Sequence, residues 1–241
     1  MKKVLLAAAA LIVPAATGPA RAADMPAKAP AAAYSPYNWS GLYIGLHVGA
    51  GRGSKRWLED GSLGIPGIER SAYDVSGWLG GGQAGYNLQT GRVVIGLELD
   101  VSATGIRGSQ GLCYVGFGPQ SCDSRIDWIT TVAGRVGWTF DRALLYAKGG
   151  FAWLGEKHNN PFPGFGVWTA SETRHGWMLG AGIEYAFSSP WSLKLEYNYF
   201  GLGTRNLGFT GPIPGNVFGA DIRQRLDVVK VGVNYRFNQI R

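Results

Sequence analysis

Apolar and polar residues alternate along most of the chain from Trp39 onward, in segments of about ten residues. The clearest segment is 191–199, where Trp, Leu, Leu, Tyr and Tyr alternate with Ser, Lys, Glu and Asn. The same period of two occurs over 41–50, 75–88, 92–102, 127–140, 143–155, 174–187 and 225–237. Since successive side chains of a β-strand point to opposite faces, the pattern predicts eight strands and an all-β fold.

The connections between these strands alternate in length. Tight turns are predicted at 89–92, 141–142 and 188–190, and long loops rich in Gly, Pro and Asn at 51–74, 104–126, 156–173 and 204–224. An even number of antiparallel strands, with short turns at one end and long loops at the other, is the plan of an outer-membrane barrel. We therefore predict an eight-stranded antiparallel up-and-down transmembrane β-barrel over 39–237. A secreted soluble β-sandwich or lipocalin-like barrel, with its apolar face turned inward, has the same period and stays open.

The tryptophans favour the membrane alternative, because a barrel in lipid places aromatic side chains at both interfaces. Seven of them form the predicted aromatic girdle: Trp39, Trp138 and Trp191 beside the short turns, and Trp78, Trp128, Trp153 and Trp177 beside the long loops. Trp57 and Trp168 fall in predicted long loops, where they either contact surface ligands or lipopolysaccharide or pack within their own loop. Charged residues make up only 16% of the chain, which is low for a soluble domain.

The N-terminal residues indicate export. Residues 1–22 have the layout of a signal peptide, with two lysines, an apolar run at 4–13 and a small-residue site at 20–22. Residues 23–38 are expected to form an Ala/Pro-rich linker, and 238–241 a short C-terminal tail. Removing Lys2, Lys3 and Arg21 lowers the formal charge from +7 to +4, which gives little support for a nucleic-acid partner. Cys113 and Cys122 would meet an oxidising compartment, and we expect them to form a disulfide.

One glycine motif needs an explanation of its own. Gly80, Gly82 and Gly85 match the dinucleotide fingerprint G-x-G-x-x-G, but no helix follows them to hold a pyrophosphate. We instead expect these glycines to let a small barrel bend tightly and to make room for larger neighbours.

The inward-facing positions of the predicted strands carry both signs of charge. The expected lumen network consists of Arg92, Glu98, Asp100, Asp127, Arg135, Lys148, Glu184, Lys194, Glu196, Lys230 and Arg236. An eight-stranded barrel is only just wide enough to be filled by side chains, and isolated charges there would be costly. The network is therefore expected to close the lumen, as in a structural barrel. The alternative is a small, weakly selective porin.

A third function, a lipid A-modifying enzyme, depends on residues near the loop end. The candidates are His158, and His175 with Ser171 and Glu172. Their spacing is common by chance, and nothing in the sequence brings a nucleophile, a base and an orienting group together. His47 is expected to be a hydrogen-bonding residue of the lumen or rim. We predict no catalytic site, no metal site and no cofactor.

Four motifs, in order along the chain, carry a resemblance: NWSGLYIG at 38–45, YAKGGFAW at 146–153, GWMLGAGIEYA at 176–186 and WSLKLEY at 191–197. They resemble the alphaproteobacterial outer-membrane β-barrel proteins of the porin/opacity type, related to the OmpA transmembrane domain. The resemblance implies an abundant, surface-exposed barrel in the outer membrane of a Gram-negative bacterium, in contact with membrane lipids and lipopolysaccharide, with loops open to surface ligands. It implies no known catalytic activity.

The last strand resembles the C-terminal signal that the barrel-assembly machinery reads. Its residues are Lys230, Gly232, Tyr235 and Phe237. Members of the family typically end at that final Phe, whereas here four residues follow.

Overall fold

A computed structural model describes residues 37–58, 67, 69–114, 119–162, 166–210 and 217–237 of the 241-residue chain. The predicted signal peptide, most of the linker and the C-terminal tail lie outside these residues. Within them the chain forms nine strands: β1 (Gly41–Leu58), β2 (Glu69–Thr90), β3 (Val93–Thr104), β4 (Arg107–Tyr114), β5 (Pro119–Phe140), β6 (Ala143–Phe162), β7 (Gly166–Ser188), β8 (Trp191–Thr210) and β9 (Val217–Arg236). No helix in the described part of the chain is long and apolar enough to cross a membrane.

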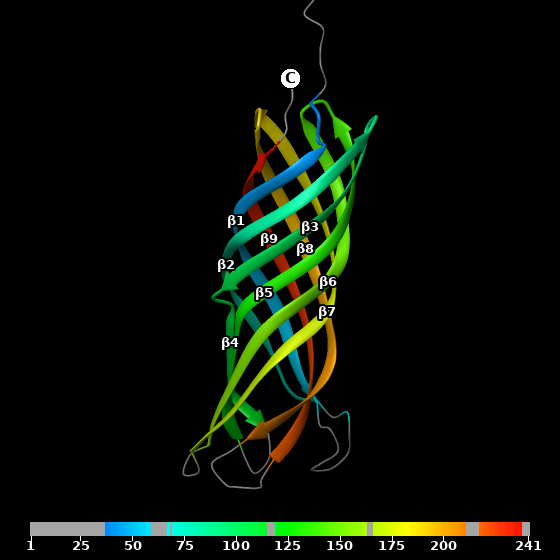
Figure 1. The fold of residues 1–241 in the computed structure, drawn as a ribbon. Helices are drawn as coiled ribbons and strands as arrows, with labels where there is room; N and C mark the ends of the chain where they lie inside the picture. Colours follow the sequence, from blue (N-terminus) through cyan, green and yellow to red (C-terminus); the bar gives the residue numbers. More distant parts are fainter. Residues whose placement is uncertain are drawn as a thin grey trace, which may run out of the picture. The chain divides into compact units, whose positions relative to one another are not determined.

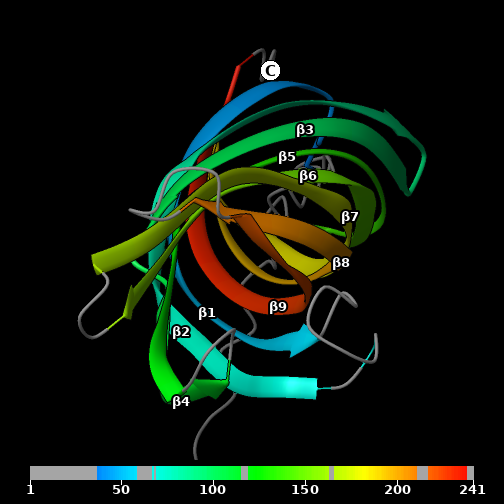
Figure 2. The ribbon, with the colours of Figure 1, turned by 90° about the horizontal axis from the view of Figure 1, so that it is seen from below.

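The strands form one closed antiparallel barrel. Each pairs with its neighbours along the order β1, β9, β8, β7, β6, β5, β3, β2, and a β1–β2 pairing closes the ring (Figure 2). β3 and β4 occupy the same place, because both pair with β2 and with β5. The ring therefore has eight places, which confirms the predicted up-and-down barrel.

The strands are longer than the sequence pattern predicts. β7, for example, has 23 residues and begins at Gly166, whereas alternation is clear only from 174. About ten residues suffice to cross a membrane, so the strands continue well past it on the side of the predicted long loops. Large parts of those loops are thus strands, and Figure 1 shows them extending the barrel toward the end opposite the C-terminus.

The apolar face of the barrel points outward. Leu46 on β1 is 74% exposed and Leu97 on β3 is 67% exposed, whereas their neighbours His47 and Glu98 are buried. A soluble sandwich or lipocalin-like barrel would have the reverse arrangement. This outward face requires lipid around the barrel, and it excludes the soluble alternative.

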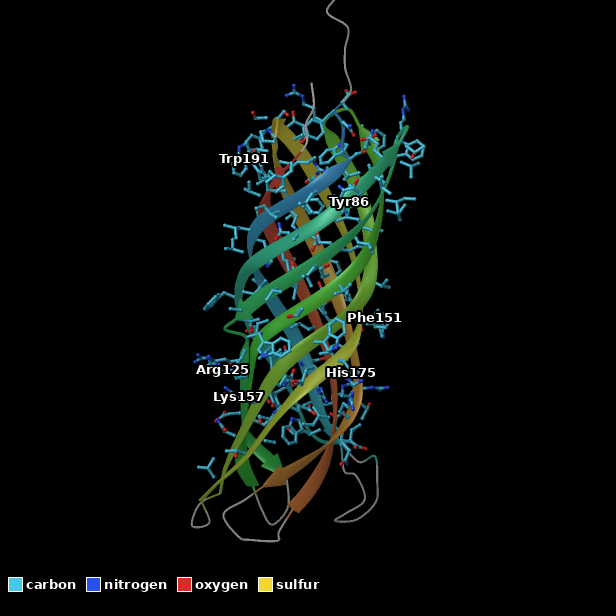
Figure 3. The ribbon with its side chains drawn as sticks, in the orientation of Figure 1. Tyr86, Arg125, Phe151, Lys157, His175 and Trp191 are labelled. Atoms are coloured by element: carbon cyan, nitrogen blue, oxygen red, sulfur yellow. The ribbon has the colours of Figure 1, made fainter. Side chains whose placement is uncertain are left out.

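Six of the seven predicted girdle tryptophans are exposed on the outer face: Trp78, Trp128, Trp138, Trp153, Trp177 and Trp191. Trp191 lies near the short-turn end in Figure 3. Trp39 does not belong with them, because its side chain is fully buried. It precedes β1, packs against Tyr37 and lies under the guanidinium of Arg236, so it fills the short-turn end of the lumen from inside.

Two glycines make room for tyrosines that lie over the neighbouring strand inside the barrel. Gly85 on β2 lies directly opposite Tyr43 on β1, and Gly182 on β7 directly opposite Tyr146 on β6. A Cβ atom at Gly182 would lie 2.6 Å from the Tyr146 hydroxyl, and one at Gly85 would collide with Tyr43. Gly85, the last glycine of the apparent dinucleotide motif, therefore has a packing role in a strand.

Candidate functional site

The barrel interior is the candidate site, and strand β6 passes through all of its levels. Starting from the short turn, its inward residues are Leu144, Tyr146 and Lys148, then Ala152 and Leu154, and finally Glu156 and His158. The lumen thus contains a charged level on the short-turn side, an apolar level in the middle and a second charged level on the loop side. We call them the turn-side network, the hydrophobic layer and the loop-side network.

The turn-side network consists of Glu98, Asp100, Arg135, Lys148, Glu184, Lys194, Glu196, Lys230 and Arg236, all buried. Lys148 is at its centre, with its Nζ atom 2.8 Å from Glu98 and 2.7 Å from Glu196. Lys194 Nζ lies 3.6 Å from each of the same two carboxylates. Two acids and two lysines from β3, β6 and β8 are therefore tied across the lumen.

Arg135 connects this centre to the short-turn end. Its guanidinium lies 3.3 Å from Glu184 and 3.6 Å from Glu98, and it stacks over the rings of Tyr43 and Tyr146, 4.9 Å from each centroid. The two tyrosine hydroxyls donate hydrogen bonds of 2.8 Å to Glu98 and Glu196. A charge buried in this way is paired both electrostatically and through aromatic faces.

Another ion pair of the turn-side network joins β9 to β3. Lys230 Nζ is 2.9 Å from both oxygens of Asp100. His47 lies beside them, bonded at 2.6 Å to Gln83 and at 2.8 Å to Ser102. His47 is therefore buried in the lumen with two hydrogen-bond partners.

The hydrophobic layer fills the next level of the lumen. Its inward side chains come from six of the nine strands and from the β3–β4 junction: Leu79, Ile106, Ile129, Ala133, Ala152, Leu154, Met178, Phe200, Leu202, Leu226 and Val228. β1 contributes glycine instead, since a Cβ atom at Gly51 would lie 2.7 Å from Ile106 and 3.3 Å from Val228. These side chains form an apolar level between the two charged networks.

The loop-side network consists of Lys55, Glu156, His158, Arg174 and Gln224, all buried. Glu156 accepts hydrogen bonds from Lys55 at 2.9 Å and from Gln224 at 2.7 Å. Arg174 donates to Gln224 at 3.0 Å and to the Ile222 carbonyl oxygen at 2.6 Å. Sequence reasoning missed this network, because all of its residues except Arg174, the first residue of a predicted strand, lie in segments that were predicted to be loops.

His158 lies within the loop-side network, beyond the girdle residue Trp153 of the same strand. Its Nδ1 atom is 2.9 Å from Ser124 Oγ, and its Nε2 atom is 3.5 Å from Glu156 Oε2. Burial is the main cause that lowers the pKa of His158, to about 4, with Lys55 and Arg174 contributing and Glu156 opposing. The order Ser124, His158, Glu156 resembles a hydrolase triad, but the three residues are at most 3% exposed, so no substrate reaches them.

Glu156, His158 and Glu172 also present possible metal-ligand atoms within 4.8 Å of one another. The surrounding charges do not suit a cation. Lys55 already neutralises Glu156, and Arg174 donates to Glu172 at 2.8 Å. A metal ion there would have to displace two buried cations, so this donor set does not fit one.

Two residues of the expected lumen network lie outside it. Arg92 is exposed in the β2–β3 turn. It comes just before the first residue of β3, so the inward and outward alternation of a strand does not apply to it. Asp127 lies at a β-bulge between Ile126 and Trp128, and the extra residue reverses the alternation. Its carboxylate is on the outside, 2.6 Å from Arg125 and 2.9 Å from Lys157.

The remaining candidates are also placed. His175 and Ser171 are exposed on the outer face of β7, where His175 contacts Arg205, whereas His158 is buried on the inner face of β6. Figure 3 shows His175 at the surface. Trp57 is not exposed in a loop but is buried against His158, whereas the side chain of Trp168 lies outside the described residues.

The cysteine side chains likewise lie outside the described residues. Their backbones are on adjacent strands, with Cys113 of β4 opposite Gln120 and Cys122 of β5 opposite Gln110. The disulfide stays a prediction.

The predicted assembly signal has an inward and an outward half. Lys230 points into the lumen, while Tyr235 packs outside between Trp191 and Phe237, edge-to-face with each ring and with centroids 5.1 Å apart in each pair. Recognition by the assembly machinery stays a prediction.

Comparison with known proteins supports the barrel independently. The family described as "Outer membrane protein beta-barrel domain" matches residues 4–237. The chain belongs to this family. The 31 kDa outer-membrane immunogenic protein of Brucella melitensis biotype 1 is 33% identical, over 98% of this chain and all of that one. The 22 kDa outer membrane protein of Rhizobium leguminosarum bv. viciae is 30% identical, over 67% of this chain and 64% of that one.

Among solved structures, the outer membrane protein OprG of Pseudomonas aeruginosa shares the fold. Its TM-score is 0.50 at 13% identity, with 82% of this chain and 96% of that one covered. The family membership places this barrel in the outer membrane of a Gram-negative bacterium.

Proposed function

We propose that this protein is a structural outer-membrane barrel whose lumen is closed to ions. The observation that carries the proposal is the hydrophobic layer between the two charged networks. An ion crossing the lumen would have to leave paired polar groups and enter an apolar level with no charge to replace its hydration shell. The turn-side network, in which every acid has a cationic partner, then serves stability rather than conduction.

The decisive experiment is conductance across a planar bilayer containing the refolded mature chain, with heat-shifted gel mobility as the test of folding. We expect the wild-type barrel to give no steady channels. A variant with Phe200→Ala and Met178→Ala, which lie opposite each other on β8 and β7, is expected to give channels, because it removes the two side chains from the layer.

The matched control carries Leu195→Ala and Leu179→Ala on the same two strands, where both side chains face lipid. It is expected to stay silent. Steady wild-type channels of defined size would contradict the closed barrel.

A small, weakly selective porin is the second candidate function. The observation that favours it is the loose placement of Lys194, whose ammonium has no carboxylate closer than 3.6 Å among the described residues. In this case the wild type would conduct, and Lys194→Ala would change the conductance and ion selectivity. Conductance that is unaffected by Lys194→Ala would argue against a path through this network.

The strand extensions suggest what the barrel offers at the cell surface. They continue past the loop-side tryptophans and carry the loops away from the membrane. Relatives bear the name outer-membrane immunogenic protein, and we propose that the loop end of this barrel is likewise exposed to the outside. Lipopolysaccharide, the assembly machinery and surface ligands are the partners that this placement supports.

A further inference from the structure

Three cationic side chains form a row across the outer face, beyond the loop-side tryptophans. Arg107 on β4 lies directly opposite Arg125 on β5, and Arg125 lies directly opposite Lys157 on β6. All three side chains point outward and are exposed. Figure 3 shows Arg125 and Lys157 together on the loop side of Phe151.

Like charges directly opposite each other destabilise a sheet, so this row needs an anion to balance it. Among the described residues, two carboxylates lie near the row, Asp127 and Asp123. Asp127, turned outward by its bulge, contacts Arg125 and Lys157 at 2.6 and 2.9 Å. Among the described residues Arg107 has no acidic partner within ion-pair distance. Asp123 lines a second hollow with all three cations but is not within ion-pair distance of them, so Asp127 is the one described carboxylate in direct contact with the row.

The row borders a hollow that faces the membrane interface. A cavity of about 650 Å³ is bounded on the membrane side by Trp78 and on the loop side by the three cations. Trp78 is 65% exposed, and its indole lies over Gly105, where a Cβ atom would be 2.6 Å from Nε1. The hollow thus has an aromatic floor at the level of the lipid headgroups and a cationic wall just beyond it.

Hydroxyl groups extend the row at both ends. Ser76 on β2 is paired with Arg107, and Ser171 on β7 with Lys157, and both are exposed. Five adjacent outward positions on five neighbouring strands therefore carry hydrogen-bond donors. Arginine and lysine form strong charge-assisted hydrogen bonds with phosphate, and serine hydroxyls can add weaker ones.

We propose that this row, Arg107, Arg125 and Lys157, binds the phosphate groups of lipid A, the phosphorylated glycolipid of the outer leaflet, with Trp78 against the sugar and upper acyl region; the inference rests on the contact with lipopolysaccharide proposed above. The headgroup phosphates of that leaflet lie just outside the hydrocarbon boundary, which is the position of the row relative to the tryptophans. Asp127 holds Arg125 and Lys157 side by side and competes with phosphate for them.

The test measures the affinity of the refolded mature protein, in zwitterionic detergent, for diphosphoryl lipid A and for the same lipid with both phosphates removed. The wild type is expected to prefer the phosphorylated lipid by at least about tenfold, and the preference should decrease with added salt. Arg107→Gln, Arg125→Gln and Lys157→Gln combined should abolish most of that preference.

Two single variants sharpen the result. Asp127→Asn is expected to tighten binding by a few fold, because it removes the competing carboxylate; a purely structural role for Asp127 predicts no gain. Arg52→Gln is the matched control. Arg52 is an outward arginine on β1, 78% exposed and already paired with Asp74 at 2.8 Å, and its loss should change the affinity by less than about twofold.

Wild-type affinity in the folded triple variant would overturn the proposal, and so would equal binding of the two lipids by the wild type. Inorganic phosphate alone, tested at the same salt, is expected to bind far more weakly. If it bound as tightly as lipid A, the site would be one for small anions and the lipid assignment would be wrong.

Discussion

The two charged networks of the lumen are built alike but lie in different surroundings. In both, a glutamate accepts from a lysine at 2.8 or 2.9 Å, and an arginine completes the cluster. The turn-side network is encircled by lipid-facing side chains, whereas the loop-side network lies in strand extensions whose outer face is polar. Only the turn-side network could be predicted from the sequence, because its strands have an apolar outer face. The buried charges themselves give no such pattern.

The same difference should appear in energetics. At the membrane level neither face of the strand offers water to a charge that loses its partner, whereas beyond the membrane local opening can do so. We therefore expect matched substitutions to cost more in the turn-side network than in the loop-side network.

The largest effect is expected from Glu98→Gln, which leaves Lys148 and Arg135 with one carboxylate fewer inside the barrel. The loss in free energy of unfolding should be about 3–5 kcal/mol, the usual cost of breaking a buried ion pair. It is measured by urea unfolding in lipid vesicles, followed by tryptophan fluorescence. Exposed Glu69→Gln is the control, and equal losses in the two variants would contradict the buried network.

Glu156→Gln makes the same change in the loop-side network. The glutamine keeps an acceptor for Gln224 but withdraws the negative charge from Lys55. We expect a loss of about 1–3 kcal/mol in the same unfolding assay. A loss as large as that of Glu98→Gln would remove the contrast between the two levels.

His158 gives the loop-side network a pH dependence. Its neighbours are Lys55, Glu156, Arg174, Ser124 and Trp57, and its pKa in the fold is about 4, below the ordinary value near 6.5. Between these values the unfolded chain binds more protons than the folded one. The contribution of neutral His158 to the free energy of unfolding is therefore complete above about pH 6.5. It is lost as the pH falls toward 4, by at most about 1.4 kcal/mol per pH unit.

The measurement is the pH titration of the His158 ring by NMR, with His158→Gln to assign the signal. A midpoint near 4 is expected, and the variant should show a weaker dependence of unfolding free energy on pH across that window. A midpoint at or above 6.5 would mean that the ring is not buried beside Lys55 and Arg174.

The smallest effect is expected at the outer surface of the extensions. Arg52 and Asp74 form an ion pair of 2.8 Å, but their side chains are 78% and 58% exposed. Arg52→Gln should reduce the free energy of unfolding by less than about 1 kcal/mol, in the same urea assay. A loss comparable to that of Glu156→Gln would show that the extension is held together by its surface rather than by its interior.

The sequence was informative where lipid constrains the outer face. Alternation of apolar and polar residues located the membrane-level strands and nine of the eleven lumen charges at inward positions. The predictions for Arg92 and Asp127 were wrong for local reasons. Arg92 lies in a turn and Asp127 at a bulge, and the alternation of apolar and polar residues predicts neither feature. The assignment of Trp39 to the girdle was wrong because this residue precedes the first strand, and its side chain packs inside the end of the barrel.

Beyond the membrane both faces of a strand can be polar, and the pattern disappears. In 51–58, for example, buried Lys55 lies next to exposed Arg56, and glycines occupy other inward positions. Such a stretch has the composition of a loop. One signal was available in the sequence. Lys55 and Trp57 are two residues apart, as are Glu156 and His158, so each pair would point to the same face of a strand. An analysis of hydrophobic alternation does not detect pairs that contain charged residues.

The central claim is that an apolar, dry level separates the two networks, and Met178 reports on it directly. The chain has three methionines, at 1, 25 and 178, so a Met25→Leu mature chain labelled at its methionine methyl group gives one barrel signal from within the hydrophobic layer. The account predicts no magnetisation transfer from water to this methyl in the folded protein. A strong water contact at Met178, in a sample that shows the folded gel mobility, would contradict the closed barrel.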